Sequence, residues 1–192
     1  MDADIVIYDG LDELDVVGPL EVLRRAGTDV RLVAHGGARQ ATGRWGLSFA
    51  AQGGLGERDV TILLVPGGGW ADRAPQGARA EAEKGELPRA IAAAAARAQI
   101  VAGVCTGTML LASAGLLDGR RATTHAAVLA ELAQQGVTAV EERVVDEGDV
   151  VTCAGVTSGI DLALQLVERE MGAGEAAAIA TAIEWRRAPA AL

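Results

Sequence analysis

Two spacings of apolar residues alternate along the chain and divide it into predicted strands and helices. Continuous or every-second apolar positions indicate strands, whereas apolar positions three and four residues apart indicate helices. Strands are predicted at 4–8, 29–36, 59–69 and 99–104, and the third of these ends in the glycine-rich loop "PGGG". A strand or small hairpin is predicted at 43–54, and a hairpin at 139–155 with "DEGD" as its turn.

Helical spacing fills most of the remaining chain. One helix is predicted to open at Pro19, because proline favours the first helical position, and to stop near Gly27. Residues 75–98 predict a long helix in which "GELP" is a candidate break. Further helices are predicted from Cys105 to about Ala114, at 122–136 with a Thr-Thr cap, at 159–172 and at 175–187.

This order of elements predicts the fold class. Strands that alternate with helices form a mainly parallel sheet covered on both faces, with right-handed crossovers. No repeat, low-complexity linker or domain boundary interrupts the pattern, so residues 1–192 are expected to form a single α/β domain. Ligands on such sheets bind beyond the carboxyl ends of the strands, which is where candidate chemistry should gather.

Composition and charge exclude several classes of protein. The net charge of −9 argues against nucleic acid as a partner, because phosphate binding needs a cationic face. No apolar run is long enough to span a membrane, and the start "MDADIVIYDG" lacks the basic region of a signal peptide. We therefore expect a cytoplasmic protein with free thiols. Two Cys and two His at scattered positions make no zinc signature, so no metal is expected.

The first candidate for chemistry is the thiol in "VAGVCTGT". Residues 103–107, "GVCTG", have the form of a nucleophile elbow, in which small residues on both sides permit a sharp strand-to-helix turn. The following helix is predicted to lower the pKa of Cys105 and favour its thiolate. The alternative is a buried structural cysteine, which is also the interpretation for Cys153 inside an apolar strand.

Three further features fall near the predicted carboxyl ends. "PGGG" is either a plain turn or a loop whose Gly67 and Gly68 amides hold a developing negative charge together with the amide of Thr106. It lacks the ending of a phosphate-binding loop. Asp15 lies between Leu14 and Val16, an apolar setting that predicts a raised pKa suited to proton transfer. A plain cap for the helix near Pro19 is the alternative.

His125 follows two threonines at the start of a predicted helix. A lone histidine there is either a structural hydrogen-bonding group or part of a site.

Several motifs, in order, resemble the ThiJ/PfpI branch of the class I glutamine amidotransferase-like superfamily. They are L-D-x-x-G-P, P-G-G, V-C-T-G, A-T-T-H and G-I-D-x-A-L, and together they span almost the whole chain. The combination is similar to that of isonitrile hydratases. The resemblance implies a flavodoxin-like three-layer sandwich, a homodimer, a small-molecule substrate and no cofactor.

The resemblance also implies roles for particular residues. Cys105 matches the nucleophile and Asp15 the acid that faces it, while Thr106 supplies a hydroxyl and an amide. Gly67 and Gly68 match the glycines that flank the substrate pocket, and His125 matches the histidine of A-T-T-H. The implied reaction adds water to an isonitrile carbon through a Cys thioimidate and yields an N-formamide.

Departures from related families narrow this expectation. The proteases of the family carry His directly after the nucleophile, where this chain has Thr106, and a glutaminase needs a downstream His–Glu pair that "GVTSGI" lacks. Amide hydrolysis is disfavoured, because expelling an amine requires a nearby acid. Glyoxalase and deglycase members use a Glu near the first strand, and Asp15 is one methylene shorter, which argues against dicarbonyl chemistry.

Two other hypotheses remain open. Similar domains form the N-terminal part of AraC-type regulators, where the domain would sense a ligand without chemistry. The chain ends at "EWRRAPAAL", which leaves no room for a helix-turn-helix domain and argues against that hypothesis. Oxidative sensing through Cys105 is the second, and it predicts preferential oxidation of that thiol over Cys153.

Overall fold

A central sheet of seven strands organises the molecule, as shown by a computed structural model that describes residues 1–37 and 39–186. Its strand order is β10-β11-β7-β6-β1-β2-β5, and all neighbours are parallel except β10 and β11. This confirms the mainly parallel sheet. The strands are β1 (Asp2–Val6), β2 (Asp29–Ala34), β5 (Gly53–Gly54), β6 (Val60–Val65), β7 (Ala98–Val104), β10 (Val144–Asp146) and β11 (Val150–Cys153).

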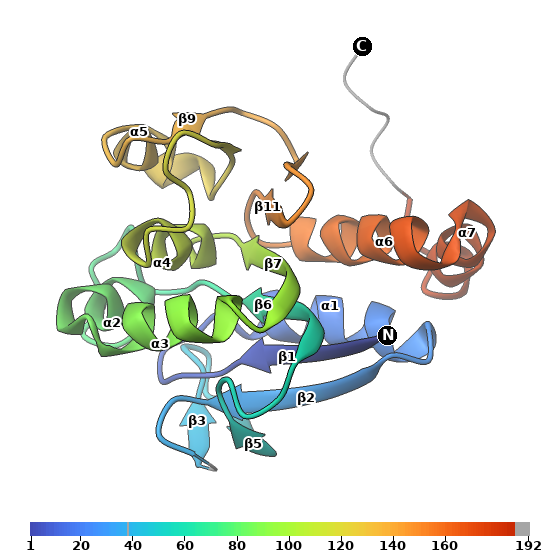
Figure 1. The fold of residues 1–192 in the computed structure, drawn as a ribbon, viewed down its shortest axis with the longest axis horizontal. Helices are drawn as coiled ribbons and strands as arrows, with labels where there is room; N and C mark the ends of the chain where they lie inside the picture. Colours follow the sequence, from blue (N-terminus) through green and yellow to red (C-terminus); the bar gives the residue numbers. More distant parts are fainter. Residues whose placement is uncertain (38, 187–192) are drawn as a thin grey trace.

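Two layers of helices cover the sheet (Figure 1). Helices α1 (Glu13–Arg25), α6 (Ser158–Met171) and α7 (Ala173–Ala182) pack together on one side. Helices α2 (Ala78–Lys84), α3 (Glu86–Ala95) and α4 (Gly107–Ser113) pack together on the other. Strands β6 and β7 lie between the layers and are almost continuously apolar, as expected where both faces are covered. The result is the expected three-layer α/β sandwich.

The predicted start of the first helix is wrong. Helix α1 begins at Glu13 and contains Pro19 in its interior, so residues 13–18 form its first turns. Asp12 caps the helix, because its side chain accepts a hydrogen bond from the Leu14 amide at 3.2 Å. Glu13 and Asp15 lie in the first turn, where the positive end of the helix dipole favours a negative charge.

The helix predicted at 122–136 is also wrong in its first half. Arg121 and Ala122 form strand β8, which pairs with β9 (Thr138–Ala139). The two threonines that follow are buried and belong to no helix. His125 caps the short 3₁₀ helix η1 (Ala126–Val128), which precedes α5 (Leu129–Ala133). Threonine has low helix propensity. Here the Thr123 amide donates to the Thr152 hydroxyl of β11, and the Thr124 hydroxyl donates to the Cys105 carbonyl just after β7.

The remaining predictions differ mainly at their boundaries. Gly85 takes a left-handed conformation (φ 76°) and separates α2 from α3, which confirms the break near "GELP". The small hairpin is β3 (Gln40–Thr42) with β4 (Ser48–Ala50), so it begins before Gly43. The last helix ends at Ala182, and position 187 of the prediction lies outside the described residues. Within the described ranges, no helix is long and apolar enough to cross a membrane.

Candidate active site

Four neighbouring strands end at one edge of the sheet, and the loops that follow them converge there. The loops are residues 7–12 after β1, 66–77 after β6, 105–106 after β7 and 154–157 after β11. Predicted site residues occupy the second and third of these loops, and Asp15 enters from the first turn of α1. The candidate residues therefore lie together at the carboxyl ends of the strands, where such sheets bind ligands.

Cys105 stands at a strained turn between β7 and α4. Its φ is +55°, a left-handed value that is uncommon for residues other than glycine and often marks functional sites. Gly107 makes this turn feasible, because a Cβ on Gly107 would lie 2.0 Å from the Val65 carbonyl oxygen. The Cys105 carbonyl accepts a 2.8 Å hydrogen bond from the Thr124 hydroxyl, which braces the turn. The backbone thus has the conformation of a nucleophile elbow.

The amides of the "PGGG" loop bind protein groups around the thiol. Gly67 N–H donates to Asp15 Oδ2 at 3.0 Å, and Gly68 N–H donates to Thr106 Oγ1 at 2.8 Å. Neither amide is left free for a negative charge on a ligand in this state. The loop holds the acid and the hydroxyl in place, and Tyr8 steadies the loop by donating to the Pro66 carbonyl at 2.6 Å.

Asp15 is a buried acid without a cationic partner. Its side chain is inaccessible to solvent, and Oδ1 has no hydrogen-bond partner among the described residues. Burial raises the pKa of Asp15 well above 3.8, and the charge of Asp12 raises it further. The Gly67 amide and the Cys105 thiol lower this pKa by smaller amounts. The predicted raised pKa is confirmed, and Oδ1 is the oxygen left to carry the proton.

The prediction that the helix start lowers the pKa of Cys105 is contradicted. Cys105 is only 4% exposed, and burial together with the nearby Asp15 carboxyl raises its pKa above the usual range, although the Thr106 amide lowers it. Desolvation and a neighbouring acid therefore outweigh the dipole of a short helix. Both the thiol and the acid therefore keep their protons to higher pH than the free groups do.

A cavity of about 230 Å³ opens over the thiol. Asp15 does not line it, so the acid meets the cavity only through Cys105 and the Gly67 loop. Within residues 1–37 and 39–186, no cluster of three Cys, His, Asp or Glu side chains could hold a metal ion. The lining residues are Asp12, Arg44, Gly68, Gly69, Trp70, Ala71, Asp72, Cys105, Thr106, His125 and Val156.

His125 lies at the cavity with its ring fixed. Its Nδ1 accepts a 3.2 Å hydrogen bond from the Ala127 amide, so a neutral ring carries its proton on Nε2. Gly155, which sequence reasoning missed, allows this placement. A Cβ on Gly155 would lie 2.3 Å from His125 Cδ2 and 3.1 Å from Cys105 Sγ. The glycine in "TCAGVTSG" therefore brings the thiol and the imidazole together.

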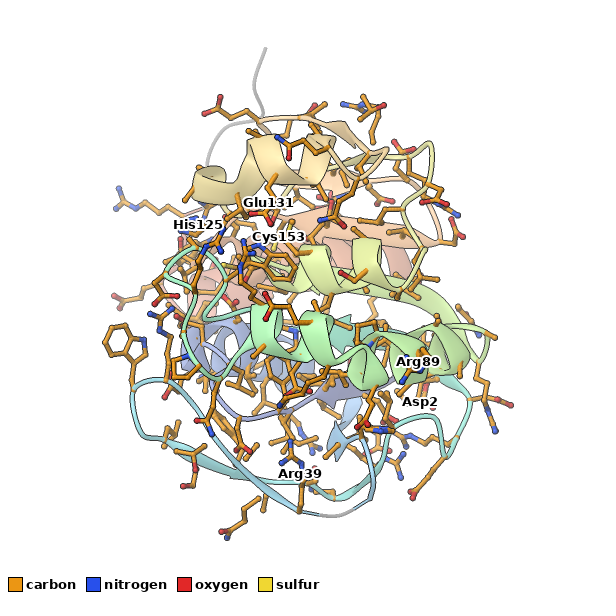
Figure 2. The ribbon with its side chains drawn as sticks, turned by 90° about the vertical axis from the view of Figure 1, so that its left-hand side faces the viewer. Asp2, Arg39, Arg89, His125, Glu131 and Cys153 are labelled. Atoms are coloured by element: carbon orange, nitrogen blue, oxygen red, sulfur yellow. The ribbon has the colours of Figure 1, made fainter. Side chains whose placement is uncertain are left out.

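Residues that the sequence analysis did not single out for function line the cavity or contact its lining. Arg79 donates to the Trp70 carbonyl at 3.0 Å, lies 5.0 Å from the centre of the Trp70 ring, and forms two 2.8 Å bonds with Glu131. In Figure 2, Glu131 and His125 lie at the same end of the molecule. Arg44 reaches the cavity from the turn between β3 and β4. In the sequence, its position directly after Gly43 is the only signal that it lies in a turn.

Cys153 is fully buried in β11, as predicted for a core thiol. Burial raises its pKa well above 9.0. Its carbonyl accepts a 3.2 Å bond from the Cys105 amide, so it supports the elbow through its backbone. Both cysteines are free thiols.

Comparisons with known proteins agree over most of the chain. The model of the DJ-1/PfpI family matches residues 1–169. An isonitrile hydratase from Pseudomonas putida is 32% identical over 186 residues, which cover 96% of this chain and 78% of that protein. A deglycase from Pyrococcus abyssi is 28% identical over 77% of this chain and 86% of that protein. The crystal structure of a ThiJ/PfpI family protein from Pseudomonas syringae superimposes with a TM-score of 0.87 at 31% identity, covering 98% and 76% of the two chains.

Proposed function

The chain belongs to the DJ-1/PfpI family, and from that membership we propose that it hydrates an isonitrile, R–N≡C, to the N-formamide R–NH–CHO. The observation that carries the proposal is the pairing of the Cys105 thiol with Asp15, a buried acid whose pKa is raised and whose Oδ1 is unpartnered. Such a pair suits a substrate whose carbon must gain both a nucleophile and a proton. The similarity to the Pseudomonas putida isonitrile hydratase supports the same reaction.

The first step adds the thiol across the isonitrile carbon. The Cys105 sulfur attacks the terminal carbon, and the new bond to sulfur brings that carbon next to Asp15 behind the thiol. Asp15 then delivers a proton to the carbon, and the thiol proton passes to Asp15. The product is a thioimidate, R–N=CH–S–Cys, which contains all the atoms of the isonitrile and the thiol. Thr106, held by the Gly68 amide, keeps its own hydroxyl hydrogen to orient the sulfur or the acid.

The second step releases the product. Water attacks the same carbon, Asp15 gives its proton to the substrate nitrogen, and Asp15 takes a proton from the water in its place. The C–S bond then breaks, the hydroxyl proton goes to sulfur, and R–NH–CHO leaves with the thiol regenerated. We propose that His125 and the Gly67–Gly68 loop position the substrate at the cavity.

The proposed assembly is a homodimer, because DJ-1/PfpI homologues are commonly dimeric. A cytoplasmic location also belongs to the proposal. Light scattering and cell fractionation test these two points separately from the chemistry.

The direct test follows formamide formation from cyclohexyl isocyanide. The wild-type protein should turn over, and the Cys105→Ala variant should lose all activity because it lacks the nucleophile. The matched control is Cys153→Ala, which removes the other thiol and should retain turnover. In D₂O the formyl carbon should carry deuterium, since its hydrogen comes from an exchangeable acid. Turnover by Cys105→Ala would sink the proposal. Absence of turnover with ligand-induced thermal stabilisation would favour a sensor instead.

A further inference from the structure

The charged groups at the cavity do not balance. Among the lining residues, Asp12 and Asp72 carry negative charges and Arg44 carries a positive charge. The other ionisable groups of the lining are His125 and the Cys105 thiol. With a neutral imidazole, the lining therefore carries one net negative charge. The charge that lacks an ion-pair partner determines the electrostatic potential that a substrate encounters in the cavity.

Arg44 is already matched. Its guanidinium donates to Asp72 Oδ2 at 2.6 Å, and its Cζ lies 5.1 Å from the centre of the Trp45 ring. The backbone turn that carries Arg44 is held by α1, because Glu13 Oε1 accepts a 2.7 Å hydrogen bond from the Trp45 amide. A substrate carboxylate could bind Arg44 only by displacing Asp72 and leaving that second carboxylate unpaired beside it.

Asp12 is the charge without a match. Its carboxylate caps α1 through the Leu14 amide, its own amide donates to the Gly67 carbonyl at 2.8 Å, and it forms no ion pair within the described part of the chain. Its effect reaches the reacting groups, since its charge raises the pKa of both Asp15 and Cys105. Arg44 opposes Asp12 at Asp15 with a smaller effect.

We propose that the cavity selects small isonitriles that carry no negative charge, and that Asp12 is the residue that rejects carboxylate-bearing ones. The inference rests on the proposed function and names its substrate class. One unpaired carboxylate, partly shielded from water, repels an anion that must approach the thiol. The volume of about 230 Å³ lies below the range of drug-sized pockets and sets the size limit.

A matched pair of substrates tests the charge. Methyl isocyanoacetate and isocyanoacetate share one scaffold and differ in a single negative charge. At low salt the ester should be hydrated with a kcat/KM about tenfold higher, and this preference should shrink as salt screens the cavity. Equal or faster hydration of the carboxylate would overturn the inference and would indicate that Arg44 exchanges Asp72 for the substrate.

The Asp12→Asn variant assigns the preference to one residue. Asparagine caps helices as well as aspartate, so the fold should be retained. The ester-to-carboxylate ratio should fall severalfold. The matched control is Asp59→Asn, which removes a carboxylate paired with Arg97 before β6, at the opposite end of that strand from the Gly67 loop. The control should leave the ratio unchanged, and an unchanged ratio in Asp12→Asn would contradict the proposal.

Binding separates this inference from the proposed function. In the Cys105→Ala variant, thermal shift titrations with the same two compounds should show tighter binding of the ester. If wild-type protein hydrates neither compound, the proposed function fails while the binding preference still decides the inference. Equal binding of both compounds, or binding of neither, would overturn it.

Discussion

Two buried aspartates on neighbouring segments of the chain have opposite surroundings. Asp4 in β1 is 2% exposed, and its carboxylate contacts two guanidinium groups, Arg31 at 3.1 Å and Arg58 at 3.0 Å. Asp15 in α1 is fully buried with one amide, one thiol and no cation. Asp4 lies toward the amino end of the sheet and Asp15 at the carboxyl end. In Figure 2, Asp2 and His125 mark these two sides.

The contrast separates a carboxylate that stabilises the fold from one that the fold keeps protonated. A buried charge is tolerated when it is paired and hydrogen-bonded, as Asp4 is. An unpaired buried carboxyl instead has a raised pKa, as Asp15 has, and so keeps its proton to higher pH. The molecule therefore uses the same residue type for stability at one end of the sheet and for proton transfer at the other. Substituting each residue should reveal the difference.

The largest expected effect is on catalysis by Asp15→Asn. Asparagine keeps an oxygen for the Gly67 amide but cannot transfer a proton. Turnover of cyclohexyl isocyanide should fall by about 10²- to 10⁴-fold. Asp4→Asn is the matched control and should hydrate the substrate at close to the wild-type rate. Similar rates for wild type and Asp15→Asn would remove the acid from the mechanism.

A methyl group at Gly155 should give the next largest effect. The Cβ of Gly155→Ala would enter the space between the His125 ring and the Cys105 sulfur. We expect kcat/KM to fall by about 10- to 100-fold, because small displacements of reacting groups are costly. Gly174→Ala in α7, where a Cβ meets nothing within 4 Å, is the control. Full activity of Gly155→Ala would show that catalysis tolerates a displacement of the His125 ring or the Cys105 sulfur.

Stability should respond in the opposite order to activity. Asp4→Asn leaves the Arg31 guanidinium without an anion and leaves Arg58 with Asp29 alone, and both arginine side chains are about three-quarters buried. We expect a loss of about 2 kcal/mol in the free energy of unfolding, less than for a wholly buried pair. Asp15→Asn should be at least as stable as wild type at pH 7. Urea denaturation of the two variants measures both effects, and a marked loss in Asp15→Asn would contradict the contrast.

The smallest effect is a pH dependence carried by Asp15. Its native pKa is raised above 3.8, so between 3.8 and that native pKa the folded protein holds a proton that the unfolded chain has lost. Folding then binds a proton, and the free energy of unfolding falls as pH rises through this window, by at most about 1.4 kcal/mol per pH unit. The stability gained by Asp15→Asn should therefore grow from pH 4 upward. A difference that is flat with pH would indicate a normal Asp15 pKa.

Local pattern predicted most of the fold and the identity of several site residues. The periods of apolar residues located every long strand, and the small residues around Cys105 predicted the elbow that its φ of +55° confirms. The apolar neighbours of Asp15 predicted its raised pKa. These features depend on residues close in sequence, so the chain alone specified them.

Other features depend on contacts between distant segments, and only the tertiary structure decided them. Pro19 suggested a helix start, yet the helix begins six residues earlier at Glu13, because Asp12 caps it there. The dipole argument predicted a low pKa for Cys105, but burial among four loops and the proximity of Asp15 raise it. Gly155 near Cys105, and Arg44 and Asp72 across the cavity, meet only in the folded chain. Desolvation and unpaired charge are properties of a three-dimensional neighbourhood, which no spacing of residues along the sequence records.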